Sequence, residues 1–177
     1  KKHSRPNRIQ KLARKIMTVS VEIPAKLYEL IRRRAEREGK LPEEIIVEAF
    51  LEQVDPESRV KVYLELYEKY LRDAEGLSSE GDIVQASEKY WGAVAALLGV
   101  IGEREGLPHY THRDLVEVIE HIALKTNDPE VSTLFRLAEG LHANFYHNFL
   151  RKETFDKHKE GVLKLIAKLK EYLGNIS

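Results

Sequence analysis

Histidine is the side chain of this sequence whose proton exchange falls nearest to neutral pH, and the chain has seven of them. His109 and His112 are separated by two residues, a spacing at which two imidazoles could bind one metal ion. No further ligand is evident nearby, and Thr111 and Asp114 account for the same segment as the start of a helix. The sequence contains no cysteine, which excludes disulfides and thiolate metal sites. We therefore expect neither a metal nor another cofactor.

A second set of candidate residues combines aromatic, amide and cationic side chains. Lys89 and Trp91 lie in the middle of a predicted helix, where Trp91 is off the centre of the apolar stripe and either covers a second helix or lines a groove. Asn144 and Tyr146 lie near His142 on a later helix, and Asn144 is expected to bind the backbone or a neighbouring helix. Lys89, Trp91, Asn144 and Tyr146 are thus a possible groove, with ordinary packing as the alternative.

Several classes of protein are disfavoured by what the sequence lacks. There is no phosphate-binding glycine loop, no nucleophile elbow and no paired metal-binding motif, so an ordinary metabolic enzyme is not expected. No apolar run approaches the roughly 20 residues that cross a bilayer, and no signal-peptide core opens the chain. The many charges, single methionine and absent cysteine fit a heat-adapted protein. We predict a cytoplasmic location without a membrane partner.

The net charge of zero hides an asymmetry along the chain. Residues 1–16 hold seven Lys or Arg and no acid, so that 22 basic and 29 acidic residues remain for the rest. Such a basic arm, with Arg5 and Arg8 as candidate contacts, could bind nucleic acid or the acidic surface of the protein itself. Because Met17 is the only methionine, residues 1–16 can equally be an upstream extension or a cloning remnant, with disorder as one expectation.

The elements that position these residues are mainly helices. Apolar residues recur at helical spacing over most of the chain, and Asp55, Asp82 and Thr111 are typical helix caps. Residues 76–81 are expected to form a loop, whereas the alternation over 18–24 predicts a short strand that ends at Pro24. The predicted fold is mainly α, an up-and-down antiparallel helical bundle preceded by a strand–helix–helix module. The predicted parts are a basic extension at 1–16, this module at 17–54 and the bundle at 55–177.

A single strand cannot form a sheet alone. The simplest source of a second strand is another copy of the chain, which predicts a homodimer through the first module. Residues 18–54 resemble a ribbon–helix–helix module of the CopG type, in which paired strands enter the DNA major groove. This resemblance implies Thr18, Ser20 and Glu22 as the positions that face DNA. Glu43 and Glu44 would repel a phosphate at the second helix, which favours dimerisation over DNA reading.

The second module has a more extensive resemblance, which covers residues 59–172. The segments GDIVQASEKYWGAVAALL at 81–98, HYTHRDL at 109–115 and AEGLHANFY at 138–146 are similar to the archaeal PaREP family. That family has no established activity and is similar in turn to HEPN helical bundles. The resemblance implies an up-and-down, HEPN-like bundle that is dimeric, and it implies no particular reaction.

The likeness to HEPN bundles brings one catalytic hypothesis. HEPN ribonucleases carry Arg and, after four to six residues, His, and they cleave RNA across a dimer without metal. Arg136 and His142 fit that spacing, and so do Arg151 and His158. His would act as the general base and Arg would stabilise the phosphate charge. The alternative for His142 is a structural histidine that Tyr146 and other neighbours on its helix face hydrogen-bond.

Three hypotheses of function follow from the sequence. The first is a non-catalytic, dimeric interaction or regulatory protein of the PaREP type. The second is a HEPN-like protein that cleaves or binds RNA through Arg136 and His142. The third is a DNA-binding regulator that uses the N-terminal module.

Overall fold

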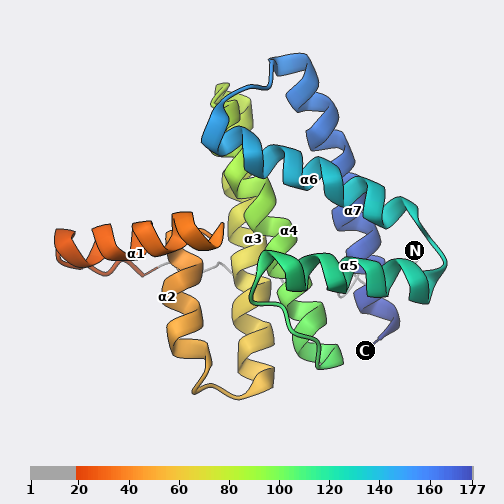
Figure 1. The fold of residues 1–177 in the computed structure, drawn as a ribbon, viewed down its shortest axis with the longest axis horizontal. Helices are drawn as coiled ribbons and strands as arrows, with labels where there is room; N and C mark the ends of the chain where they lie inside the picture. Colours follow the sequence, from red (N-terminus) through yellow and green to blue (C-terminus); the bar gives the residue numbers. More distant parts are fainter. Residues whose placement is uncertain (1–18, 177) are drawn as a thin grey trace, which may run out of the picture.

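The computed structural model describes residues 19–176, and this part of the chain forms seven α-helices (Figure 1). None of the helices in these residues is both long and apolar enough to cross a bilayer. Their bounds are α1 Ala25–Glu38, α2 Pro42–Leu51, α3 Pro56–Glu80, α4 Ile83–Glu105, α5 His112–Thr126, α6 Glu130–His147 and α7 Lys152–Asn175.

The predicted helix caps are confirmed by their hydrogen bonds. The Asp55 side chain accepts from the amide of Ser58, and the Asp82 side chain accepts from the amide of Gln85. Thr111 accepts from the amide of Asp114, whose carboxylate in turn accepts from the Thr111 amide. These bonds satisfy amide groups that the first turn of a helix leaves without a partner.

The predicted strand is wrong. Residues 19–24 are irregular, and the described chain is entirely helical. The Pro24 carbonyl accepts from the amides of Leu27 and Tyr28, so it opens α1 instead of closing a strand. The alternation of Val19 and Val21 is present, but a strand needs a neighbour for its backbone groups, and the described residues offer none. The strand–helix–helix part of the predicted fold class is therefore corrected to a helical hairpin, α1–α2.

The predicted loop at residues 76–81 is also wrong, because α3 continues to Glu80. Gly76 lies on an open side of the helix, where its lack of a side chain costs only about 1 kcal/mol in helix propensity. Leu77 packs against the core from this last turn. The helix ends at Gly81, whose φ of 87° is in the left-handed region that glycine adopts readily.

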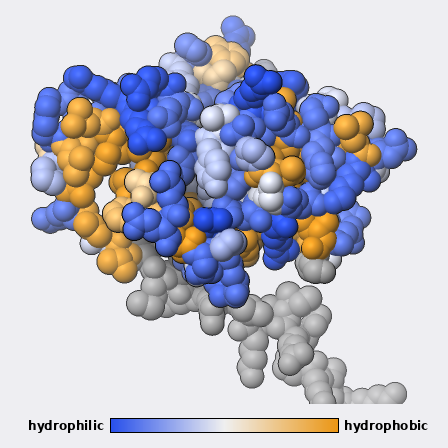
Figure 2. Space-filling model, turned by 60° about the horizontal axis from the view of Figure 1, so that its bottom comes forward, coloured by the Kyte–Doolittle hydropathy of each residue, from blue (hydrophilic) through white to orange (hydrophobic). Residues whose placement is uncertain are grey.

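The helices form a bundle with the hairpin on one side. In Figure 1, α3 and α4 run side by side, α5, α6 and α7 lie on the other side of α4, and α1 projects away from the bundle. Figure 2 shows a largely hydrophilic surface on which orange, hydrophobic residues gather at the left, the side where α1 and α2 lie in Figure 1. The hairpin therefore differs from the bundle in its exposed apolar area.

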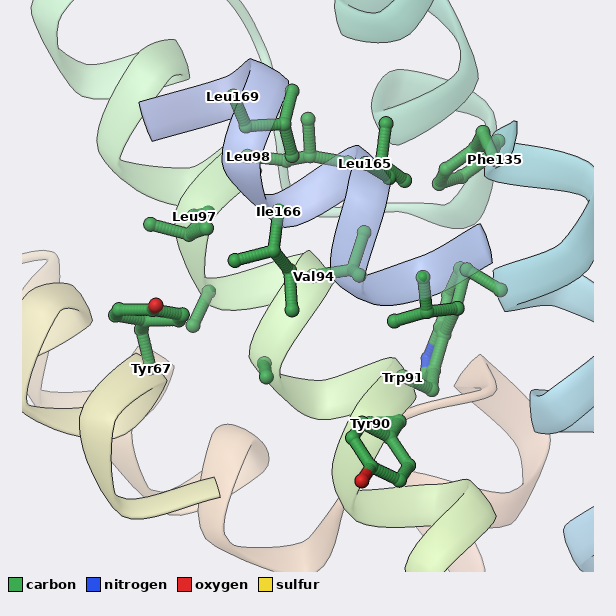
Figure 3. Packing of buried hydrophobic residues seen from close by; sticks show 14 of the residues in the cluster. Tyr67, Tyr90, Trp91, Val94, Leu97, Leu98, Phe135, Leu165, Ile166 and Leu169 are labelled. Atoms are coloured by element: carbon green, nitrogen blue, oxygen red, sulfur yellow. The ribbon is translucent and has the colours of Figure 1, made fainter. Parts of the chain in front are cut away.

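Helix α4 is the centre of the core. Trp91, Val94, Leu97 and Leu98 of this helix pack against residues of α6 and α7, as Figure 3 shows for Phe135 and its neighbours. The sequence of α4 is apolar on nearly every side instead of amphipathic. A helix of this kind is stable when other helices surround it, and most of α4 is buried.

Glycines let neighbouring segments approach α4 closely. A Cβ atom at Gly92 would lie 2.7 Å from the Leu41 side chain and 3.0 Å from the Tyr70 ring. A Cβ atom at Gly102 would overlap the ring of His109. Larger residues at these positions would displace the hairpin in the first case and the segment before α5 in the second.

Candidate functional site

The indole of Trp91 is stacked between two histidines. Trp91 is 2% exposed, and its ring centroid lies 4.7 Å from that of His142 on α6 and 5.5 Å from that of His112 on α5. The interplanar angles of 24° and 22° are close to parallel stacking. Phe135 adds a tilted contact at 5.7 Å. Trp91 thus packs against α5 and α6, and it also lines a small cavity.

Glu139 connects the outer histidine to the arginine of the predicted catalytic pair. Its carboxylate lies 2.8 Å from Nε2 of His112 and accepts a 2.7 Å hydrogen bond from Arg136. The Arg136 side chain is 61% exposed, so this ion pair is at the surface. Such pairs contribute little to stability, about 0–1 kcal/mol, but they keep the guanidinium beside a carboxylate.

His142 is half-buried, and one of its two ring nitrogens is shielded from water without a hydrogen-bond partner in the described part of the chain. Burial, with a smaller effect of nearby His112, lowers the pKa of His142 to about 4, so the ring is neutral at pH 7. Its Nδ1 atom is buried without a hydrogen-bond partner in the described part of the chain. Its Nε2 atom lies 3.3 Å from where a Cβ atom of Gly39 would be, so the end of α1 covers it. Tyr146 contacts the ring edge-on at 5.2 Å.

Arg136 and His142 are thus near each other without acting as a pair. No hydrogen bond or ion pair joins them among the described residues. A general base has to present a nitrogen to its substrate and titrate near the working pH, whereas His142 is half-buried and has a pKa of about 4. In the second match to the same spacing, Nδ1 of His158 lies 2.9 Å from the Thr154 carbonyl. The catalytic role stays a prediction.

Asn144 has a structural role that the sequence interpretation anticipated. Its side chain is fully buried, and its amide nitrogen donates to Ser87 of α4 at 3.0 Å. Its carbonyl oxygen accepts from the amides of Phe149 and Leu150 at 3.0 and 2.8 Å. These three bonds fix the turn after α6 against α4 and use the polar atoms of the side chain.

Two of the four predicted groove residues line a real groove. Lys89 and Tyr146 belong to the wall of a 400 Å³ groove between the hairpin and the bundle. Lys89 also lies 3.6 Å from Glu43 of α2 and 5.4 Å from the centre of the Tyr70 ring. Trp91 and Asn144 do not line this groove, since the first lines a separate small cavity and the second is fully buried.

A buried charged cluster was not found by sequence reasoning. Glu103 lies 2.9 Å from Nε of Arg59 and 3.2 Å from Nε2 of His109, while Nδ1 of His109 is 2.8 Å from the Leu107 carbonyl. His109 and His112 therefore face different carboxylates, those of Glu103 and Glu139, and do not converge on one point. The cluster joins three separate segments, and no spacing in the sequence could have indicated it.

The N-terminal candidates are only partly within the structure. Arg5, Arg8 and Thr18 lie outside the described residues. Ser20 is exposed in the irregular segment before α1. At the start of α2, the carboxylate of Glu44 accepts a 2.7 Å hydrogen bond from the Leu41 amide, and thus occupies a donor that a phosphate would need.

The hairpin presents an apolar surface that is only partly covered, here called the hairpin face. It contains a groove of 640 Å³. Residues of the hairpin face are Val21, Leu27, Leu30, Ile31, Ile46 and Phe50. Phe50 is 71% exposed, although it is one of the largest apolar side chains of the protein. Exposed apolar surfaces of this kind are typical of interaction sites.

Comparisons with known proteins identify relatives of the bundle. The sequence profile of the archaeal PaREP1/PaREP8 family matches residues 62–166. The crystal structure of a protein from Sulfolobus solfataricus is similar to this chain, with a TM-score of 0.54 and 26% sequence identity. The match covers 61% of this chain and 96% of the other. No curated protein matches.

Proposed function

This chain belongs to the archaeal PaREP1/PaREP8 family, and from that premise we propose that it is a non-catalytic interaction protein that works as a homodimer. The single observation that carries the proposal is the hairpin face. The bundle buries most of its apolar residues within one chain, whereas α1 and α2 leave Leu27, Leu30 and Phe50 in contact with water. The hydrophobic effect favours a partner that covers such a surface.

A second copy of the chain is a suitable partner because the hairpin face offers both an exposed ring and an apolar groove. The ring is that of Phe50, and the groove of 640 Å³ is lined by Leu27, Leu30, Ile46 and Phe50 itself. In a two-fold symmetric interface each copy contributes the same surface, so a protrusion and a groove on one face can fill each other. Arg34, the charged residue on the groove wall, is paired with Glu38 within its own helix, which limits repulsion between copies.

The contacts of Arg136 and His142 support the non-catalytic part of the proposal. Arg136 is engaged by Glu139, and His142 is stacked on Trp91 with its ring neutral at pH 7. Both side chains are accounted for by packing and by a surface ion pair. The HEPN-like alternative would require the two groups to meet in an open cleft between copies.

The dimer is tested by measuring mass in solution. We expect sedimentation equilibrium to give twice the chain mass for the unmodified protein and the single chain mass for Leu30→Glu and Phe50→Glu. A carboxylate placed in the hairpin face would lose its hydration if the dimer formed, and the cost is several kcal/mol.

The matched control is Leu124→Glu, since Leu124 of α5 is 82% exposed and lies outside the hairpin face. This variant should stay dimeric. A monomeric unmodified protein, or a dimer that survives both hairpin substitutions, would contradict the proposal.

A further inference from the structure

The groove between the hairpin and the bundle contains a buried carboxylate that has no partner. Glu88 of α4 is 8% exposed and lines this groove. Within residues 19–176 it makes no hydrogen bond and no ion pair. Buried carboxylates in proteins are usually paired, because removal from water is costly for the charged form.

The pKa of Glu88 agrees with an uncompensated charge. Burial raises it to about 7, the attraction of Lys89 lowers it, and the repulsion of Glu43 raises it further. The charged form of the carboxylate is therefore disfavoured by its surroundings, and a cation beside it would favour that form.

The other charged groups on the wall of the groove already have partners. Lys89 lies 3.6 Å from Glu43, and Lys40 donates to Glu48 at 2.7 Å. Arg32 forms an ion pair with Glu36 one turn along α1. These pairs leave Glu88 as the group whose charge is not balanced inside the groove.

Three aromatic residues form part of the remaining wall, beside Ala35, Pro42 and Gln85. Tyr28 of α1 and Phe145 and Tyr146 of α6 line the same groove. Aromatic faces attract cations that carry an alkyl chain, both by the ring quadrupole and by apolar contact. A bare divalent metal would instead require several oxygen ligands, and no group of three or more candidate metal ligands occurs in the described part of the chain.

We propose that this groove binds a small aliphatic primary amine in its protonated form. The ammonium group would donate to the carboxylate of Glu88, and the alkyl chain would lie against Tyr28, Phe145 and Tyr146. The groove volume of 400 Å³ is within the range of small-molecule sites in proteins. A ligand held there contacts both the hairpin and the bundle, and therefore holds the hairpin in place.

This site is independent of the proposed dimer. Of the α1 residues, the groove uses Tyr28 and Arg32, whereas the hairpin face uses Leu27, Leu30 and Ile31, which point in other directions around the helix. Binding of the amine and association of two copies can therefore succeed or fail separately.

The test is calorimetric titration of the full chain with 1,5-diaminopentane at pH 8, where both Glu88 and the amine are charged. We expect saturable binding for the unmodified protein and at least tenfold weaker binding for Glu88→Gln, which keeps the size of the side chain. Tyr146→Leu should weaken binding by a smaller factor. The uncharged 1-pentanol should give no saturable heat, which separates ammonium recognition from plain apolar binding.

The matched control is Glu120→Gln, because Glu120 is an exposed glutamate on α5. It should bind the diamine as the unmodified protein does. Absence of saturable binding to the unmodified protein, equal affinity of Glu88→Gln, or equal weakening by both glutamine variants would overturn the proposal. Circular dichroism of Glu88→Gln should match that of the unmodified protein, and Tyr146→Leu provides a second variant outside the carboxylate.

Discussion

The hairpin α1–α2 and the bundle α3–α7 differ in how much of their apolar side-chain surface is buried within the chain. In the bundle, α4 is surrounded by neighbouring helices and its large side chains are nearly inaccessible to water. In the hairpin, Leu41 and Leu51 reach the core of the bundle, but Leu27, Leu30 and Phe50 remain exposed. The bundle thus buries most of its large apolar side chains within one chain, whereas the hairpin packs on the bundle at one side and, as we propose, on a second copy at the other.

Ion pairs between side chains of the same helix stabilise α1, which has few buried contacts. Lys26 and Arg33 both pair with Glu29. Arg32 and Arg34 pair with glutamates one turn later. Pairs of this spacing contribute about 0.2–0.5 kcal/mol each to a helix. The difference between the regions therefore predicts that equal substitutions have unequal effects.

The largest expected effect is that of removing a phenylalanine ring from the core of the bundle. Phe135→Ala should lower the free energy of unfolding by about 3–5 kcal/mol, because it removes a buried ring and leaves a cavity. Phe50→Ala in the hairpin should cost less than about 1 kcal/mol when measured on the monomer, since its ring is already in water. Urea unfolding at low protein concentration measures both values.

Phe149→Ala is the control for the bundle, because this ring lies just after α6 and is exposed. It should behave like Phe50→Ala. If the Phe50 and Phe135 variants lost equal stability as monomers, the hairpin would be as well packed as the bundle and the contrast between the regions would fail.

An intermediate effect is expected where the two regions meet. Glu44 of the hairpin and Glu88 of the bundle both have a pKa raised by burial to about 7, above the ordinary value near 4.5. The folded protein therefore binds protons more tightly than the unfolded chain at these sites, and this contribution is fully present below pH 4.5. It is lost as pH rises towards 7, on the order of 1–3 kcal/mol per group.

Thermal unfolding between pH 4.5 and 8 checks this dependence. The decline should be shallower in Glu44→Gln and in Glu88→Gln than in the unmodified protein, and shallowest when both are combined. A Glu120→Gln variant should retain the full decline. Identical pH profiles for all five proteins would show that the two carboxylates are not buried at this junction.

The smallest effect is expected at the surface of the bundle. Arg136→Ala should change the free energy of unfolding by less than about 1 kcal/mol, because it removes only an exposed ion pair with Glu139. Incubation with single-stranded RNA should give no cleavage by either the unmodified protein or this variant. Cleavage that requires Arg136 and His142 would instead support the HEPN-like alternative and would show the bundle to be the active region.

Parts of the fold were predictable because their causes are local. Asp82 and Thr111 cap helices through bonds to residues three positions later, so the sequence contains both partners. The strand prediction failed because an alternating pattern says nothing about whether a neighbouring strand is available. Phe149 follows Leu141 and Phe145 at helical spacing, but Asn148 adopts a left-handed conformation with φ of 45°, so α6 ends before Phe149 and its ring is exposed.

The candidate sites were less predictable than the fold. Lys89 and Tyr146 line a groove without Trp91 and Asn144, and Asn144 binds the backbone and a neighbouring helix. The burial of Glu88 could not be predicted from the sequence, since a glutamate on a long helix is normally exposed. Its burial arises because the hairpin covers that side of α4.

The sequence by itself determined the positions of most of the helices, through apolar periodicity and capping residues that act over one or two turns. Only the tertiary structure decided that Trp91 lies between His112 and His142, that Glu103 collects Arg59 and His109, and that Glu88 is buried without a partner. The physical reason is the range of the interactions. Backbone hydrogen bonds and caps join residues near in sequence, whereas burial and electrostatics depend on which distant segments pack together.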